Sequence, residues 1–343
     1  MYRAPSVVGA GAGVNPAVPR AHDEGVEIPE ELVGTRVAVR HRVGERDGRP
    51  LLTDAVGDLA ADGTDAVVVR TRRGPVRVER SAVVAVRAVP PAPPRRAALA
   101  AVIRLEGLCA DAWPAEVDRP LGAWRLRAAG GYTGRANAAL ALGDPGLPIT
   151  AALDEVRRFA GEHGVPPRVH VPVGSPWDRA VAAEGWVLNV GHAKGAEVSV
   201  LVAPLAELAP PSGLRIELPT RPPDDWWPLA VGGPPTPAQE RVLAGAPETA
   251  FGTLRGPDGG VLGQVRATVV DDHVHISMLE VVPAARRRGH ATALLAAAGV
   301  WGREHGARWA VLQVALQNDG ARSLYDRLGY VEHHRYRYLV PPA

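Results

Sequence analysis

The chain has 343 residues, a net charge of +2 and a single cysteine. This length exceeds what one hydrophobic core usually organises, so two or three domains are expected. The shares of hydrophobic (46%) and charged (22%) residues are those of a globular protein and exclude a wholly disordered chain. The small net charge creates no basic field that would favour nucleic-acid binding. One cysteine excludes an internal disulfide framework and a cysteine-based zinc site, and the apolar run around Cys109 predicts a buried structural thiol.

The sequence gives no sign of membrane insertion or export. No apolar stretch is long enough to span a bilayer, and the N-terminus lacks the apolar core of a signal peptide. We therefore expect a cytoplasmic protein without a membrane partner.

The first ninety residues predict a tail and a small barrel. Residues 1–28 mix Gly, Ala and Pro without periodicity, which predicts a flexible tail. Residues 29–90 contain short β-type runs separated by turns, which is typical of an SH3-like all-β barrel, with strands at 35–43, 66–71, 76–78 and 83–89. Its exposed faces are rich in arginine: Arg36, Arg40, Arg42, Arg70, Arg72, Arg73 and Arg77. These arginines form either a solvated surface or a docking face for an acidic partner, and any nucleic acid would bind here and nowhere else.

Two proline-rich segments divide the rest of the chain. Residues 90–94 form a stiff linker, and the prolines between 204 and 211 mark a second boundary, which gives blocks 95–207 and 212–343. In block 212–343 antiparallel strands come first and are then interleaved with helices, which predicts an α/β (α+β) sheet of mixed direction. Block 95–207 has a similar order after its first helix. We expect two copies of one fold in tandem.

The elements predicted in these blocks follow from apolar periodicity and from helix stop signals. The predicted helices are 96–108, 150–162, 176–184, 237–243, 290–305 and one ending at Leu328. The predicted strands are 123–127, 138–142, 168–173, 214–218, 249–254, 261–270, 273–282, 309–316 and a last one ending at Val340.

Residues 279–292 are the most informative segment. They predict a strand that ends at Pro283, a short loop, and a helix that opens near Gly289. Small residues at Gly289 and Ala291 let backbone N–H groups approach an anion, and the helix N-terminus adds unpaired donors and the positive end of its dipole. Three arginines add positive charge: Arg286, Arg287 and Arg288. The segment predicts a pyrophosphate cradle; an ordinary charged helix start is the alternative.

A second segment follows a buried strand. Asn318 can cap a helix that ends at Leu328-Gly329-Tyr330. With both segments the sequence resembles the GNAT N-acetyltransferase superfamily. The family's first signature, Arg/Gln-x-x-Gly-x-Gly/Ala after Val-x-Pro, matches Arg286, Gly289 and Ala291 behind Val281 and Pro283. Its second signature, Asn-x-x-Ala-x-x-Leu-Tyr-x-x-x-Gly-Phe/Tyr, matches Asn318, Ala321, Leu324, Tyr325, Gly329 and Tyr330.

The resemblance implies a role for each of these positions. The strand backbone at Leu279, Glu280 and Val281 would pair with the pantetheine arm of acetyl-CoA, and one amide there would donate to the thioester oxygen. The pyrophosphate would be held by loop amides of Arg286, Arg287, Arg288, Gly289, His290, Ala291 and Thr292. Asn318 would contact the pantetheine, and Ala321 belongs to the same cofactor-binding set. Tyr325 would protonate the departing thiolate, unless it is simply a packed helix aromatic.

A base is also needed, because an amine attacks the thioester only when it is neutral. Glu280 and His275 are the candidates, and a water path is the alternative. In a regular strand Glu280 shares the face of Ile276 and points away from the face of His275. Both candidates reach one cleft only if a bulge intervenes. No metal site is predicted.

The first block differs from the second at the cofactor site. Residues 166–170, where a counterpart of the cradle is expected, offer none, and no Asn–Tyr pair precedes Gly185. We expect a degenerate GNAT-like copy that helps to shape the acceptor site. The polar segment 130–137 either lines the acceptor cleft or is a turn.

A barrel followed by tandem GNAT-like blocks resembles an actinobacterial group described as histone-acetyltransferase-like, which suggests a protein or peptide lysine as acceptor. We therefore expect an acyltransferase that moves an acetyl group from acetyl-CoA, its co-substrate, directly to a primary amine. The alternatives are a small-molecule amine acetyltransferase and a non-catalytic CoA-binding sensor or scaffold whose barrel binds a partner.

Overall fold

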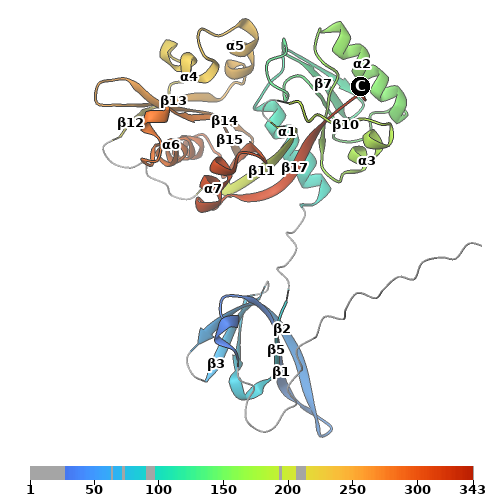
Figure 1. Ribbon diagram of the computed structural model, residues 1–343, viewed down its shortest axis with the longest axis vertical. Helices are drawn as coiled ribbons and strands as arrows, with labels where there is room; N and C mark the ends of the chain where they lie inside the picture. The colour runs from blue at the N-terminus through green and yellow to red at the C-terminus, as the bar shows by residue number, and fades with distance from the viewer. Residues whose placement is uncertain are drawn as a thin grey trace, which may run out of the picture. The chain divides into compact units, whose positions relative to one another are not determined.

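The computed structural model describes residues 28–62, 65–71, 74–89, 97–192, 195–205 and 214–342. The chain divides into two compact units, Met1–Arg95 and Arg96–Ala343, which are described one at a time (Figure 1). The predicted tail before Ile28, the predicted linker 90–94 and the basic pair Arg72 and Arg73 lie outside the described residues. Within the described ranges, no helix is long and apolar enough to cross a membrane.

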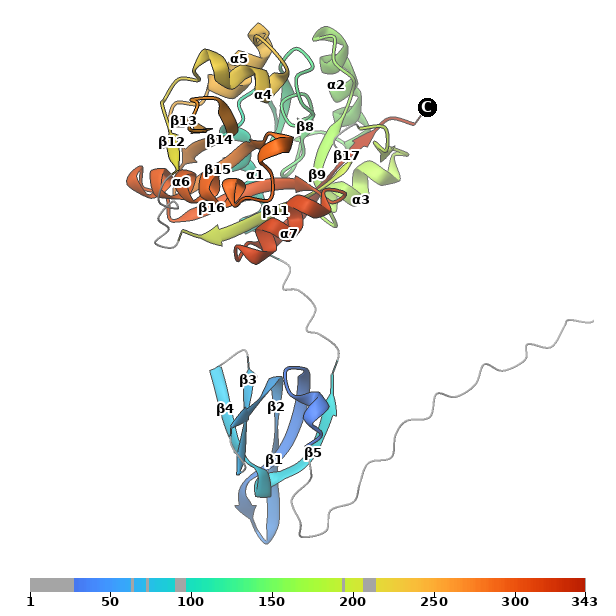
Figure 2. The ribbon, with the colours of Figure 1, turned by 60° about the vertical axis from the view of Figure 1, so that its left-hand side comes forward.

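The first unit is a five-stranded antiparallel sheet with the order β4-β3-β2-β1-β5 (Figure 2). Its elements are two 3-10 helices, Glu30–Leu32 and Arg80–Ala82, and the strands β1 Arg36–Arg46, β2 Arg49–Asp62, β3 Ala66–Thr71, β4 Gly74–Glu79 and β5 Val83–Ala88. Val37 and Val39 on β1 are fully buried, whereas Arg40 points outward, as the predicted alternation requires. The sequence analysis missed β2, because that segment has few β-branched residues and is a strand through its long pairing with β1.

The second unit combines seven α-helices with twelve paired strands in its described part. The helices are α1 Leu99–Asp111, α2 Ile149–Glu162, α3 Pro176–Ala183, α4 Trp227–Val231, α5 Pro237–Ala244, α6 His290–Glu304 and α7 Asp319–Arg327, with 3-10 helices at Asp224–Trp226 and Pro283–Ala285. The strands are β6 Val117–Leu121, β7 Trp124–Ala128, β8 Ala139–Leu140, β9 Val169–Pro172, β10 Val187–Leu188, β11 Glu197–Pro204, β12 Arg215–Glu217, β13 Thr249–Arg255, β14 Val261–Val270, β15 His273–Val281, β16 Trp309–Ala315 and β17 Val331–Val340.

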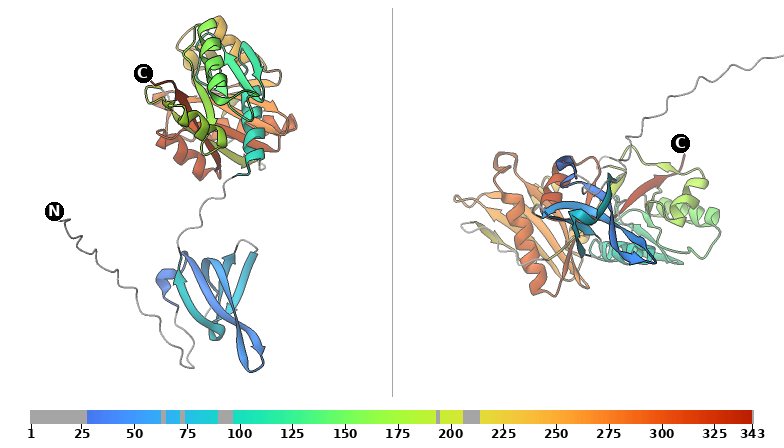
Figure 3. Two further views of the ribbon diagram at one scale, coloured as in Figure 1. Left: turned by 90° about the vertical axis from the view of Figure 1, so that its right-hand side faces the viewer. Right: turned by 90° about the horizontal axis from the view of Figure 1, so that it is seen from below.

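The strand order reveals a repeat with exchanged last strands. The sheet runs β12-β13-β14-β15-β16-β11-β17-β9-β8-β7-β6. The series β7, β8, α2, β9, α3, β11 recurs later in the chain as β14, β15, α6, β16, α7, β17. However, β11 pairs with β16 of the second series, and β17 pairs with β9 of the first, so each series donates its last strand to the other (Figure 3). The tandem α/β fold expected from the sequence is confirmed, whereas the boundaries at 207 and 212 stay a prediction.

Helices cover both faces of this sheet. α6 packs against one face of the second series, in an apolar cluster that includes Ile276 of β15 and Leu312 of β16. α2 covers the equivalent face of the first series. α1 lies on the opposite face, where Leu105 and Cys109 pack against Val311 of β16. Cys109 is buried, as predicted. We call the face covered by α1 the α1 face.

Candidate functional site

The strand predicted to bind the cofactor, β15, loses one of its neighbours halfway along. Its parallel pairing with β16 runs from His273↔Trp309 to Ile276↔Leu312, although β15 continues for five more residues. On the other side β15 stays paired with β14 as far as Val281. Within the described residues, the backbone edge of residues 277–281 that faces β16 therefore has no partner strand. Such an edge offers N–H and C=O groups to an extended ligand.

A bulge in β15 sets the direction of Glu280. Met278 and Leu279 together oppose a single residue of β14, and Met278 has a φ of 52°. The inserted residue shifts the alternation of the side chains by one position. Glu280 therefore lies on the α1 face together with His275, and the expectation that it shares the face of Ile276 is wrong. The bulge that the two candidate bases need to reach one face is present.

The loop between β15 and α6 leaves backbone donors open. α6 begins after Gly289, as predicted; Gly289 has a φ of 79° and has no side chain to cap the helix. A Cβ at Gly289 would meet no atom within 4 Å, so the space in front of the helix is free. Arg287 also has a left-handed φ, 61°. Left-handed residues in a turn of this kind favour a concave arrangement of N–H groups, and the positive end of the α6 dipole lies behind it. This loop can hold an anion.

The three arginines of the loop do not act alike. The Arg286 guanidinium lies 2.8 Å from Glu280 Oε1, and its Nε donates to the Val281 carbonyl at 2.9 Å. Arg286 thus fixes the end of β15 and the Glu280 carboxylate rather than pointing into the loop. Both side chains are about half exposed, so their ion pair contributes at most roughly 1 kcal/mol to stability. Arg287 and Arg288 are exposed and remain the arginines that can face an anion.

Helix α7 carries the second predicted motif. The Asn318 side chain accepts a hydrogen bond from the Ala321 N–H at 3.2 Å, which confirms it as the helix cap. Tyr325 is buried in the apolar cluster that also contains Val281 and Leu279 near the open edge of β15. Burial raises the pKa of Tyr325 to about 12, so its hydroxyl keeps its proton at neutral pH. A tyrosine that donates a proton must have a protonated hydroxyl, and a tyrosine that only packs in the core would be protonated as well.

The two candidate bases have different surroundings. Glu280 is exposed, whereas His275 is 1% exposed and lies edge-on to Trp113 with 6.3 Å between ring centroids. Burial, together with the positive charges of Arg135 and Arg266, lowers the pKa of His275 well below 6.5. Glu280 is therefore open to solvent, while neighbouring side chains cover His275.

The polar segment 130–137 forms a tightly bonded loop. Asn137 is buried, and its side chain makes four hydrogen bonds with the main chain of Ala129, Gly131, Tyr132 and Thr133. Thr133 Oγ1 accepts a further hydrogen bond from the Trp113 indole at 3.0 Å. Tyr132 packs in one apolar cluster with Met278 of the β15 bulge. The loop therefore lies beside the predicted cofactor strand on the α1 face.

The first series has a different loop at the equivalent position. The repeat places the counterpart of the cradle between β8 and α2, at residues 141–148, and not at 166–170 as expected. In the structure, residues 166–170 connect α2 to β9. The expected position was wrong because β8 is only two residues long and α2 begins soon after it. Residues 141–148 contain no arginine, and Pro148 precedes α2. This loop lacks the charge and the N-terminal glycine of the second series.

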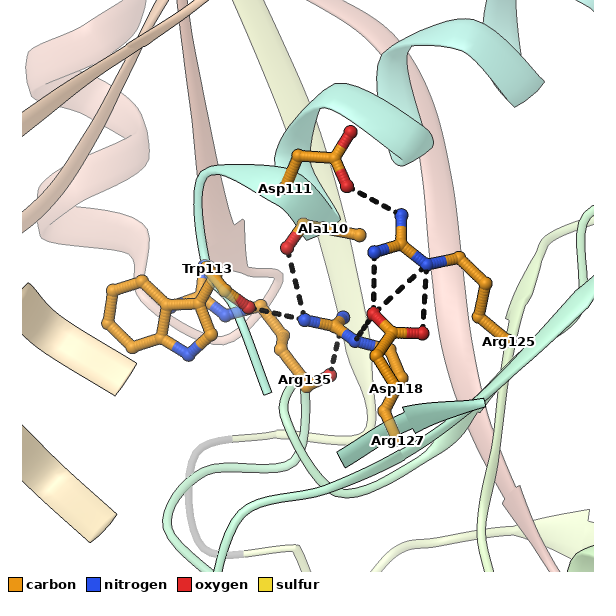
Figure 4. Close-up of polar contacts among 7 residues, drawn as sticks. All are labelled: Ala110, Asp111, Trp113, Asp118, Arg125, Arg127 and Arg135. Carbon is orange, nitrogen blue, oxygen red and sulfur yellow. Dashed lines mark hydrogen bonds and ion pairs between the residues drawn. The ribbon is translucent and has the colours of Figure 1, made fainter. Parts of the chain in front are cut away.

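Buried arginines that the sequence analysis missed surround the C-terminal end of α1. Arg127 of β7 donates to the carbonyls of Ala110, Trp113 and Arg135 (Figure 4). Arg266 of β14 donates to the Ala112 carbonyl at 3.0 Å and to the Leu243 carbonyl, at the end of α5, at 2.6 Å. Burial lowers the pKa of Arg127 to about 10 and that of Arg266 to about 9. The negative end of a helix dipole balances such charges. In the sequence, the signal for the buried Arg266 was its position as a charged residue inside the apolar run 261–270.

Three features meet at the end of β15: an open strand edge, a helix start rich in N–H donors, and a buried tyrosine that keeps its proton. Together they can hold an extended amide-rich arm, an anion and a proton. Among the residues that the structure describes, no group of three or more His, Cys, Asp or Glu side chains could hold a metal ion.

Comparison with known proteins agrees with this arrangement. The model of the family described as "Probable histone acetyltransferase Rv0428c C-terminal" matches residues 100–339, and that of the "Rv0428c N-terminal Sm-like domain" matches residues 31–87. The probable histone acetyltransferase Rv0428c of Mycobacterium tuberculosis is 32% identical over 317 residues, which cover 90% of this chain and 95% of that protein. A GCN5-related N-acetyltransferase from Kribbella flavida has the same fold, with a TM-score of 0.52 and 19% identity over 71% of this chain and 95% of that one. The Sm-like barrel is close to the SH3-like type expected from the sequence. The chain thus belongs to the family of the probable histone acetyltransferase Rv0428c and is an acyltransferase of GNAT type.

Proposed function

We propose that the chain transfers an acetyl group from acetyl-CoA directly to a primary amine. The observation that carries this proposal is the continuity of the open edge of β15 with the donor-rich start of α6. A pantetheine arm could pair with that edge while the attached pyrophosphate reaches the loop amides. Membership of a GNAT-type family supports the same co-substrate.

In this proposal the cofactor-binding residues act mainly through their backbone. The amides of Leu279, Glu280 and Val281 bind the arm, and those from Arg286 to Thr292 bind the pyrophosphate. The free space at Gly289 supports the second role, because any side chain there would stand in front of the donors. The first turn of α7, with Asn318 and Ala321, contacts the pantetheine arm on the side that faces away from β15. Acetyl-CoA supplies the activated acyl group, and the chain orients it.

Proton movement falls to two side chains. Glu280 takes the proton from the incoming ammonium, and Arg286 holds its carboxylate in place. Tyr325 gives its proton to the departing thiolate, because burial keeps the hydroxyl protonated. The burial of His275 makes it the weaker candidate base. No covalent intermediate with the protein is required.

A lysine amine of a protein or peptide is the proposed acceptor. The name of the relative in Mycobacterium tuberculosis, a probable histone acetyltransferase, supports a protein acceptor. The exposure of Glu280 also supports it, since a lysine side chain on a large partner could reach an exposed carboxylate.

Release of free CoA thiol from acetyl-CoA tests the proposal, with and without a panel of peptide and small-molecule amines. Amine-dependent release would establish the transferase and rank its acceptors. If calorimetry showed acetyl-CoA binding but no amine caused release, direct transfer to an amine would be refuted.

A further inference from the structure

Arg135 carries a positive charge to the point where β15 and β16 separate. Its guanidinium donates to the Gln313 side chain and lies over the Trp113 ring, 4.3 Å from the ring centroid. Gln313 directly follows Leu312, the last residue of β16 paired with β15. Arg135 is largely but not fully buried, so part of its surface is open to solvent.

The side chains around Arg135 belong to the face that carries the candidate base. Val311 packs against α1, and Gln313, two residues further along the same strand, points to the same α1 face. The bulge directs Glu280 to this face as well. Gln313 and Glu280 are separated along the strands by two to three residue steps, about 7–10 Å. Arg135 thus lies on the same face of the strands as the proposed base, toward the start of the open edge of β15.

Among the residues that the structure describes, no Asp or Glu forms an ion pair with Arg135. Arg125 contacts Asp111 and Asp118, and Arg127 lies 3.6 Å from Asp118 (Figure 4). Arg266 is balanced by two helix-end carbonyls. Arg135 has only an amide oxygen and an aromatic face, and no Asp or Glu lies within ion-pair distance of it in the described parts of the chain.

The loop around Arg135 holds it in place. Asn137 bonds four main-chain groups of the loop, and Thr133 is tied to Trp113, over which Arg135 stacks. A guanidinium fixed in this way loses little side-chain freedom when it binds an anion, and its planar donors match a carboxylate in two-point contact. A flexible surface arginine, by contrast, loses side-chain conformational entropy when it binds an anion.

We propose that Arg135 selects acceptors by binding a carboxylate that the acceptor carries near its reacting amine. This inference rests on the proposed function and names the acceptor chemistry: an extended lysine-type amine with a carboxylate nearby. The carboxylate belongs either to a small molecule or to an acidic group of a peptide. Arg135 holds it while Glu280 receives the amine.

Matched acceptors with and without the carboxylate test this inference. We expect the wild-type protein to acetylate Nα-acetyllysine with a kcat/KM about 10- to 100-fold above that for Nα-acetyllysine amide, since a hydrogen bond to a charged group is worth roughly 1.5–3 kcal/mol. Two peptides that differ only in having Lys-Glu or Lys-Gln separate the two sources of the carboxylate. A site directed to peptides prefers the Lys-Glu peptide over the Lys-Gln peptide. A site directed to small molecules distinguishes only Nα-acetyllysine from its amide.

Variants of Arg135 provide the second arm. Arg135→Gln should remove the preference by lowering kcat/KM for the acid while leaving the amide unchanged, and Arg135→Lys should lose part of it. Arg179→Gln, at an exposed arginine on α3, is the control and should keep the full preference. Circular dichroism melting shows whether each variant folds. Equal rates for acid and amide in the wild type, or an equal loss on both in a folded Arg135→Gln protein, would overturn the inference. Absence of CoA release with every amine would instead refute the proposed transferase.

Discussion

At the scale of single residues, protonation decides which side chains can serve the proposed reaction. Tyr325 holds its proton because the apolar cluster around it disfavours the phenolate. Tyr325→Phe keeps the ring and removes the proton. We expect turnover to fall about 100-fold or more, as is usual for loss of a general acid, with acetyl-CoA affinity nearly unchanged. Tyr330→Phe, at the buried ring 5.6 Å away, is the control and should keep its turnover. Unchanged kcat in Tyr325→Phe would remove this tyrosine from its role.

Glu280 can be tested separately from His275. Glu280→Gln keeps the shape of the side chain and abolishes its basicity, so we expect kcat/KM to fall at least about 100-fold. Stability should change little, because the ion pair with Arg286 is about half exposed. Rates measured at several pH values, together with thermal melting, check both expectations. A full rate in Glu280→Gln would point to a water path or to His275.

At the scale of elements, local sequence predicted most helices and strands of the second unit. β14 was predicted with its bounds, Val261–Val270, because its apolar run lies between clear turn signals. β8 is shorter than expected, since only Ala139–Leu140 find partners on both sides. The loop between β15 and α6 was predicted from its glycine and arginines. The bulge at Met278 was not, because it depends on pairing with β14 rather than on the residues of β15.

The start of α6 gives a prediction at this scale. Gly289→Val would force a branched residue into a left-handed conformation and fill the space in front of the helix donors. We expect the Kd for acetyl-CoA, measured by calorimetry, to rise at least about 10-fold, because the loss of one charge-assisted hydrogen bond is enough for that. Gly306→Val is a matched control: Gly306 has a φ of 89°, follows the other end of α6 and is equally open. A similar affinity loss in both variants would mean that instability, not the cradle, causes the effect.

At the scale of the molecule, the connections between the two series of elements could not be read from the sequence. The exchange of β11 and β17 depends on pairings between strands more than a hundred residues apart in the chain. The candidate site shows the same limit. Two local motifs located the residues proposed to bind acetyl-CoA, whereas the proposed acceptor side depends on Arg135 and Gln313, which are 178 positions apart. Periodicity and spacing carry no information about such contacts.

Arg266 allows a test of how strongly the two series depend on each other. It reaches from β14 to the C-terminal end of α1, 154 positions away, and also to the end of α5. Arg266→Met would fill a similar volume but leave two buried carbonyls without this donor, at roughly 1–3 kcal/mol each. Methionine has no charge, so the desolvation cost of burying the guanidinium disappears and offsets part of that loss. We expect the free energy of unfolding, from urea titration, to fall by about 2 kcal/mol.

The control for Arg266 is a second arginine that joins the same two parts of the molecule. Arg241 of α5 pairs with Glu116 at 3.1 Å, but both side chains are about half exposed. Arg241→Met should therefore cost less than about 1 kcal/mol. Equal effects of the two substitutions would mean that burial does not set the strength of this contact. A stabilised Arg266→Met protein would mean that the desolvation cost of the buried charge exceeds the stabilisation from its hydrogen bonds.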